Sequence, residues 1–93
     1  MPIPALGLRA GTRDNGAEIV AIEPGSVAVL AGLHVTDVIN KVDGKPINTA
    51  MELAAELSNH APGSKIRLGY MFRSSALGYF QKETVVIIGP LSK

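Results

Sequence analysis

The sequence predicts an α+β domain that is mainly β: a small, partly open antiparallel β-barrel or sandwich of five to six strands, capped by two helices. The chain has 93 residues, of which 46% are apolar and only 4% aromatic, so it can build one aliphatic core. Short β-branched or alternating segments recur between turn formers, and two other segments carry helix caps and stops. We therefore expect residues 1–93 to form a single domain with a core over about residues 5–88.

Charge and composition exclude several function classes. Nine basic and eight acidic residues leave a net charge of +1 without any run of like charge, so we expect no nucleic-acid partner. The absence of Cys removes disulfides, thiolate zinc sites and cysteine nucleophiles. No apolar run approaches the ~20 residues that cross a bilayer, and residues 1–4 lack the regions of a signal peptide. We expect no cofactor and no direct membrane insertion by this domain.

The first predicted elements form a β-hairpin. Residues 6–10 are mostly apolar, and residues 18–22 have the β-branched composition of a strand. Residues 11–16 lie between them and contain the Gly, Asp and Asn that favour turns. An exposed loop should therefore join the two strands.

A short helix should follow this hairpin. Pro24-Gly25 ends the second strand, and Ser26 has the side-chain oxygen of an N-cap. Residues 27–31 can then form about two turns of helix, which Gly32 stops at the C′ position. A helix this short can plug only one end of a barrel.

The middle of the chain predicts a strand and a tight turn. Residues 37–42 alternate as a strand does. Asp43-Gly44 is a strong turn signal before the short extended piece at residues 45–47.

The second predicted helix covers residues 50–59. Thr49 can cap it, and Glu52 completes a Thr-x-x-Glu capping box. Leu53 and Leu57 lie one turn apart on a face that suits the core. An adjoining stripe has i, i+4, i+7 spacing: Ala50, Ala54 and Leu57. The helix is expected to have a core side and a groove side.

Two strands complete the predicted domain. Residues 65–72 alternate, which predicts a half-buried strand. Its inward face would carry Ile66, Leu68, Tyr70 and Phe72. A connection at residues 74–78 leads towards a final β-branched strand at residues 83–88.

The run of turns, helix and strand signals in residues 23–47 is the most specific part of the chain. With the order of elements over nearly all of residues 5–88, it resembles a PDZ domain of the bacterial kind found in HtrA-type proteases. The resemblance implies a non-catalytic peptide-binding module that regulates or targets a larger protein such as a protease. It also favours the bacterial cell envelope or periplasm as the compartment.

The tripeptide Leu6-Gly7-Leu8 matches the hydrophobic-Gly-hydrophobic carboxylate-binding loop of this family by its position before the first strand. Successive backbone N–H groups in such a turn can hold a peptide's terminal carboxylate, and Gly7 permits the bend. The preceding ligand residues would then add a strand along the open edge at Leu8, Arg9 and Ala10. Main-chain hydrogen bonds would give affinity, and alternate side-chain pockets would give selectivity.

The predicted pocket for the last ligand side chain is apolar. Leu6 and Leu8 would line it from below, and Ala54, Leu57 and Ser58 would line it from the helix. We therefore expect the partner to be the C-terminus of a protein or peptide whose last residue is a medium-sized aliphatic or an aromatic one.

Two departures from the family pattern refine this expectation. Ala50 stands where many eukaryotic PDZ domains have a His that selects Ser or Thr, which favours an apolar residue two positions before the ligand's end. Pro4-Ala5 precede the loop without a basic residue, so amides, water, Arg9 or Arg67 must support the carboxylate.

Simpler explanations exist for several of these residues. Leu6-Gly7-Leu8 could open a strand with a Gly bulge, and the helix stripe could serve only the core. His34 and His60 lack metal-site spacing, and Ser26 lacks a nucleophile elbow. Asp43 suits a turn, and Asp37 suits a hydrogen bond at a strand entry. We expect neither a metal site nor enzyme activity in this chain.

An alternative of another class stays open. Residues 76–80 place apolar bulk in a predicted connection, where it could cover the end of the barrel or dock a neighbouring domain or subunit. The chain would then be a structural or assembly domain in contact with other domains of a parent chain. Such a domain would have no free peptide ligand, and its groove could be closed by its own termini.

Overall fold

The computed structural model describes residues 1–74, 76 and 78–89, and within these residues it contains seven strands and two helices. One antiparallel sheet has the strand order β1-β2-β3-β4-β6-β7, and β5 pairs with β4 beside this path. The elements have these bounds: β1 Pro2–Ile3, β2 Leu8–Arg13, β3 Gly16–Ile22, α1 Val27–Leu30, β4 Val38–Val42, β5 Lys45–Pro46, α2 Ala50–Leu57, β6 Lys65–Ser74 and β7 Gly78–Ile87. The predicted fold class is confirmed.

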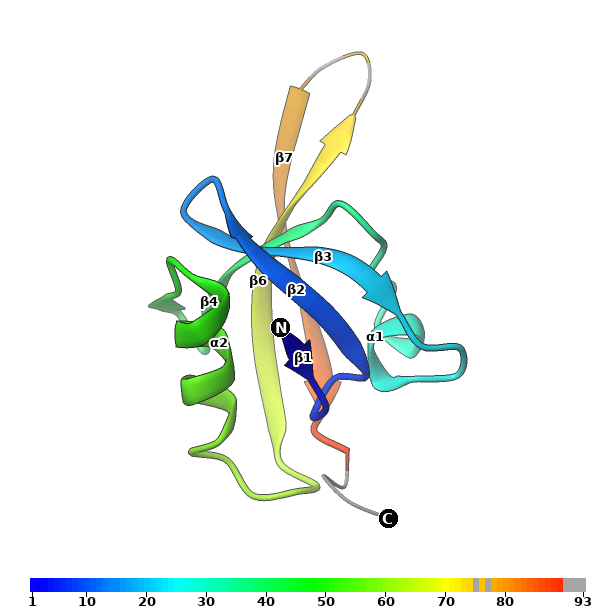
Figure 1. Cartoon of the computed structure of the whole chain (residues 1–93), viewed down its shortest axis with the longest axis vertical. Helices are drawn as coiled ribbons and strands as arrows, with labels where there is room; N and C mark the ends of the chain where they lie inside the picture. The colour runs from blue at the N-terminus through cyan, green and yellow to red at the C-terminus, as the bar shows by residue number, and fades with distance from the viewer. Residues whose placement is uncertain (75, 77, 90–93) are drawn as a thin grey trace.

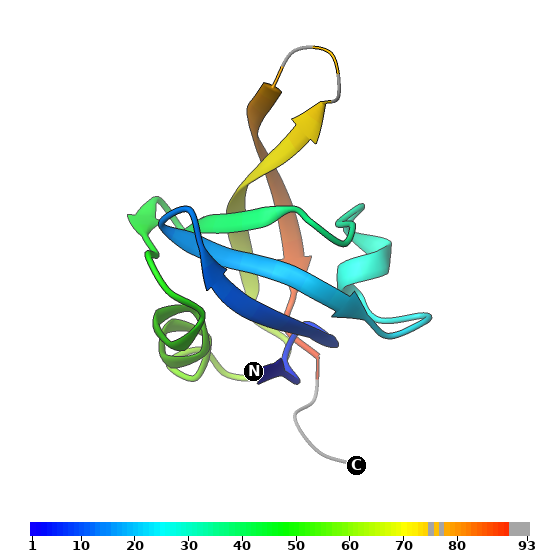
Figure 2. The ribbon, with the colours of Figure 1, turned by 45° about the horizontal axis from the view of Figure 1, so that its top comes forward.

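The sheet bends so that its two halves cross. Figures 1 and 2 show β2 and β3 running across the direction of β6 and β7, with α2 at one side of the sheet and α1 at the other. The core is aliphatic, as the composition predicts. Its largest fully buried side chains are Ile3, Leu6, Ile19, Ile39, Leu53, Ile66, Leu68, Ile88, Val38 and Val42.

The β2–β3 hairpin is tighter than the sequence predicts. Its turn consists of Asp14 and Asn15, whose φ angles are 53° and 60°, and Arg13 pairs with Gly16. Two successive positive φ angles match the right-handed twist of a two-residue hairpin, and Asp and Asn tolerate them. Residues 11–13, which we expected in the loop, therefore belong to β2.

Both helices begin at the predicted caps, but both are shorter than predicted. In α1, Ser26 Oγ accepts from the Val29 N–H at 3.4 Å, and Gly32 takes a φ of 85° after the helix. In α2, Thr49 Oγ1 accepts from the Glu52 N–H at 2.9 Å. Glu52 Oε1 accepts from the Asn48 N–H at 2.7 Å, so this half of the capping box reaches one residue further back than predicted.

The β6–β7 hairpin is longer than predicted. Both strands have ten residues, and Figure 1 shows the hairpin extending beyond the rest of the sheet. Tyr79 and Phe80, which we expected in a connection that covers the barrel's end or docks a neighbour, lie in β7, and Phe80 stacks on Phe72 with ring centroids 5.5 Å apart. Leu77 of the same apolar run lies outside the described residues.

Asp37 is the buried charged residue among those that the structure describes. Its side chain is 4% exposed, and Oδ2 accepts from the His34 N–H at 2.9 Å, which is the predicted hydrogen bond at the entry of β4. Burial raises the pKa of Asp37 above its ordinary 3.8, although the His34 N–H and the charge of Lys82 act in the opposite direction. The carboxyl therefore serves the turn before β4.

Neither helix in the described part of the chain has both the length and the apolar character needed to span a membrane.

Candidate peptide-binding groove

The Leu6-Gly7-Leu8 loop turns two backbone N–H groups towards one acceptor. The Leu6 and Gly7 N–H groups both donate to the Ile3 carbonyl oxygen, at 3.1 and 3.0 Å, and Gly7 also approaches the Pro4 oxygen at 3.2 Å. Gly7 adopts a φ of 72°, which a residue with Cβ rarely takes. Both N–H groups are thus satisfied within the turn, and they converge on one oxygen.

The loop is held from behind by the segment that leads into α1. The Leu6 carbonyl accepts from the Ala28 N–H at 3.0 Å, and the Gly7 carbonyl accepts from the Glu23 N–H at 2.9 Å. A Cβ on Gly7 would lie 2.4 Å from the Ser26 Cβ. Ser26 therefore packs directly against the loop, in addition to capping α1.

The edge of β2 is not open where we expected it to be. β1 pairs antiparallel with β2, placing Pro2 opposite Arg9 and Ile3 opposite Leu8. Met1 and Ala10 exchange two hydrogen bonds, from the Ala10 N–H to the Met1 oxygen at 2.8 Å and from the Met1 nitrogen to the Ala10 oxygen at 3.0 Å. Pro2 fits this register because its missing N–H falls on the pair without ladder hydrogen bonds.

A small apolar pocket lies between the start of the chain and α2. Its volume is about 160 Å³, and its lining comes from two segments: Ile3, Pro4 and Ala5 on one side, and Ala54, Leu57 and Ser58 on the other. Ala54 is half-buried, Leu57 is 3% exposed, and Ser58 is exposed. The three predicted helix residues therefore share one pocket wall.

The other predicted site residues have separate positions. Leu6 and Leu8 belong to the hydrophobic core at 0% and 3% exposure, and they do not line this pocket. Arg9 is exposed on β2, whereas Ala10 is fully buried. Ala50 is buried at the start of α2, where its N–H donates to Thr12 Oγ1 at 2.9 Å.

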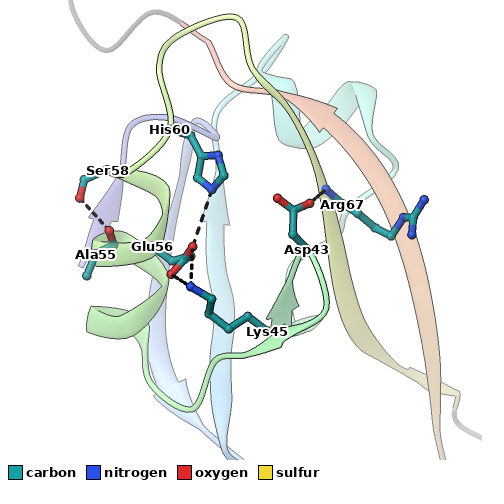
Figure 3. Close-up of polar contacts among 7 residues, drawn as sticks. All are labelled: Asp43, Lys45, Ala55, Glu56, Ser58, His60 and Arg67. Atoms are coloured by element: carbon teal, nitrogen blue, oxygen red, sulfur yellow. Dashed lines mark hydrogen bonds and ion pairs between the residues drawn. The ribbon is translucent and has the colours of Figure 1, made fainter.

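The polar side of α2 carries an ion-pair cluster, which Figure 3 shows. Glu56 accepts from Lys45 Nζ at 3.3 Å, and its other oxygen lies 3.7 Å from His60 Nε2. The exposed Ser58 hydroxyl donates to the Ala55 carbonyl at 2.7 Å. These contacts hold α2 and the following turn against β5 and leave the pocket wall free of charge.

Arg67 is engaged on the far hairpin. Its backbone N–H donates to Asp43 Oδ1 at 2.8 Å, which Figure 3 shows, and its guanidinium Nε lies 3.9 Å from Glu83 Oε1. The Asp43 side chain therefore ties the predicted Asp43-Gly44 turn to β6, and the Arg67 guanidinium already has an acidic partner on β7.

A second apolar surface lies between α1 and β7, and the sequence reasoning missed it. This pocket measures about 530 Å³ and is lined by residues of α1, by the end of β7 and by Gly63. Three of its lining residues are exposed: Leu30 at 83%, Val85 at 49% and Ile87 at 56%. The sequence signal for this surface was the apolar Val85 and Ile87, which alternate along β7 on its outward face.

Within the described residues, no group of three or more His, Cys, Asp or Glu side chains is arranged to hold a metal ion.

The geometry defines the class of the domain: a bent antiparallel sheet in which a glycine loop leads into β2, with α2 facing that strand across an apolar pocket. A family model described as PDZ domain matches residues 4–76. The chain belongs to the PDZ domain family, and its relatives place it with the bacterial HtrA-like members. Domains of this family bind peptides and occur beside other domains in protease chains.

Two curated relatives illustrate the similarity. The periplasmic pH-dependent serine endoprotease DegQ of Escherichia coli K12 is 36% identical over 57 residues, covering 61% of this chain and 12% of that protein. The periplasmic serine endoprotease DegP of Salmonella typhimurium LT2 is 37% identical over 63 residues, covering 68% of this chain and 13% of that protein. The chain thus corresponds to the PDZ portion of much longer proteases.

A solved structure has the same fold. The HtrA-type protease AlgW, determined with a decapeptide, superposes with a TM-score of 0.74 at 16% identity. The match covers 90% of this chain and 28% of that one. At this identity the likeness shows the fold alone.

Proposed function

We propose that this domain is a non-catalytic module that binds the extended C-terminus of a protein or peptide by adding a strand to β2, opposite α2. The observation that carries the proposal is the pair of Leu6 and Gly7 N–H groups aimed at one acceptor, beside an apolar pocket. A terminal carboxylate at that acceptor position would receive both hydrogen bonds. Its last side chain would then lie against α2.

The antiparallel pairing of β1 with β2 supports strand addition at this edge. The backbone of residues 1–3 already pairs antiparallel with Leu8–Ala10 of the loop and β2, so this edge accepts a strand in the required direction. Strand addition supplies main-chain hydrogen bonds that do not depend on the ligand's sequence. Affinity on the order of micromolar is expected, because a short peptide loses conformational freedom on binding.

The lining of the pocket supports an apolar last residue. Ala54 and Leu57 offer no charge, and this apolar wall suits a medium-sized aliphatic or an aromatic side chain. The buried Ala50 at the start of α2 offers no hydrogen-bonding side chain to select Ser or Thr upstream. In a longer parent protein, such a module would present or sense peptides for a separate catalytic domain.

The test is a fluorescence-anisotropy titration with labelled peptides that end in Val, Ile or Leu. Each peptide is compared with its C-terminally amidated form, because amidation removes the charge that the Leu6 and Gly7 N–H groups would hold. Weaker binding of the amidated form is expected. Equal binding of both forms would contradict carboxylate capture.

A matched pair of variants on α2 locates the pocket. Ala54→Trp fills the pocket and should abolish binding, whereas Ala55→Trp places the same side chain at a neighbouring exposed position and should bind normally. Thermal melts of both variants check that the fold persists. Undiminished affinity in folded Ala54→Trp would show that the ligand lies elsewhere.

A second candidate function is favoured by the pairing of β1 with β2. If residues 1–3 never leave the edge, the domain is a structural or assembly module with no free peptide ligand. Tyr79 and Phe80, which are 47% and 40% exposed on the projecting hairpin, would then be a docking surface for a neighbouring domain or subunit. Sedimentation that depends on protein concentration and changes with Phe80→Ser, together with silence towards peptides, would support this function.

A further inference from the structure

We propose that residues Met1–Ile3 are an internal pseudoligand, which occupies the groove of β2 and α2 and must leave before a peptide can bind; the inference rests on the proposed function. These residues are called the strap below. The form with the strap in place is closed, and the form with the strap detached is the one that binds.

The backbone of the strap makes the hydrogen bonds that a peptide would need. The Ile3 carbonyl oxygen accepts hydrogen bonds from the Leu6 and Gly7 N–H groups. It thus lies where we propose that a terminal carboxylate oxygen of the peptide would lie. Two residues upstream, Met1 exchanges both of its backbone hydrogen bonds with Ala10. A peptide that adds to the same edge competes for these same donors and acceptors, so strap and peptide exclude each other.

The side chain of Ile3 matches the expected last residue of a ligand. It is 2% exposed, and it lines the same pocket as Ala54, Leu57 and Ser58. Pro2, which alternates with it along the strand, is exposed. A β-branched aliphatic side chain therefore faces α2 across the pocket that the proposed function assigns to the peptide.

The strap is a short edge segment that can detach without breaking the long strand pairings of the sheet. β1 has two residues, one of them a proline without an N–H, whereas β6 and β7 pair over ten residues each. Short edge segments with few hydrogen bonds open far more easily than the strands of the core. No other strand has to move, because β2 keeps its pairing with β3.

Detachment changes the apparent affinity in a defined way. If the closed form dominates, the measured Kd equals the intrinsic Kd divided by the open fraction. An open fraction of about one tenth weakens peptide binding about tenfold. A variant without a closed form should therefore bind the peptide about tenfold more tightly.

The first test locks the strap in place. Pro2 and Arg9 are directly opposite, on a pair without ladder hydrogen bonds, where Cα atoms lie about 4.5 Å apart. That spacing is compatible with a disulfide, and the chain has no other Cys. In the double variant Pro2→Cys, Arg9→Cys, the oxidised protein should lose binding of a labelled peptide ending in Met-Pro-Ile with a free carboxylate, and reduction should restore it.

The second test opens the strap. Ile3→Ser removes the apolar anchor and should raise affinity for the same peptide about tenfold. Ile87→Ser, at a position that is 56% exposed on β7, makes the same chemical change away from the groove and should leave affinity unchanged. Circular dichroism checks that both variants fold. If Ile3→Ser does not fold, the disulfide variant alone tests whether the strap blocks peptide binding.

The outcomes separate the two proposals. Equal peptide affinity in the oxidised and reduced forms would overturn the pseudoligand while leaving peptide binding in place. Absence of binding by the wild type, by Ile3→Ser and by the reduced double variant would overturn the proposed function and the pseudoligand together. Binding that appears only on reduction supports both.

Discussion

Gly7 offers the sharpest test of how the loop is built. Its φ of 72° costs a residue with Cβ about 1–2 kcal/mol. A new Cβ would also lie 2.4 Å from the Ser26 Cβ, and relieving such overpacking costs about 1–3 kcal/mol. Gly7→Ala should therefore lower the free energy of unfolding by about 2–5 kcal/mol, a large part of the roughly 5–15 kcal/mol typical of a domain.

Gly25→Ala is the matched control for this substitution. Gly25 has the same φ of 72°, but a Cβ there would meet no atom within 4 Å. Gly25→Ala should lower the free energy of unfolding only by the cost of the positive φ, about 1–2 kcal/mol. Urea unfolding of both variants measures the difference, which reports the contact with Ser26 alone.

A second substitution separates the clash from the backbone term. Ser26→Gly removes the obstructing Cβ and weakens the α1 cap by only a few tenths of a kcal/mol. Gly7→Ala combined with Ser26→Gly should therefore recover stability towards the level of Gly25→Ala. Equal losses in Gly7→Ala and Gly25→Ala, or no recovery in the double variant, would refute the packing of Ser26 on the loop.

The remaining predictions concern the scaffold. Burial raises the pKa of Asp37, so the native state holds its proton more tightly than the unfolded state, and stability falls as pH rises above 3.8 through the raised pKa. Asp37→Asn should remove this decline, as urea unfolding at several pH values measures; an unchanged pH dependence would contradict it. Leu53→Ala, at a fully buried position of α2, should cost about 2–5 kcal/mol, whereas Met51→Ala, at 68% exposure, should cost little. Equal losses in thermal melts would contradict the assigned face.

The local part of the fold could be predicted from the sequence. Ser26 and Thr49 cap their helices through contacts within three residues, and Asp43-Gly44 takes the positive φ angles of a tight turn, each where predicted. Alternation in residues 65–72 likewise placed Ile66 and the other inward residues of β6 in the core or against it. Such signals need no knowledge of distant neighbours.

The long-range features could not be predicted. Two prolines in residues 1–4 hide a two-residue strand that exists only because β2 is beside it. Tyr79 and Phe80 looked like part of a connection because the β-branched run of the final strand begins only at residue 83, and pairing with β6 makes them a strand. The placement of Gly7 in a donor turn followed from the family resemblance, whereas Leu6 and Leu8 belong to the core and not to the pocket wall. The role of this pocket in peptide binding stays a prediction.

Amide chemical shifts test the central claim most directly. Isotope-labelled protein is titrated with a peptide that ends in Ile with a free carboxylate, and in parallel with its amidated form. The largest changes should occur at the Leu6 and Gly7 amides and along residues 54–57, and the amidated peptide should produce much smaller ones. Silence at these amides, with changes only around Tyr79 and Phe80 that follow protein concentration, would contradict peptide capture in this groove.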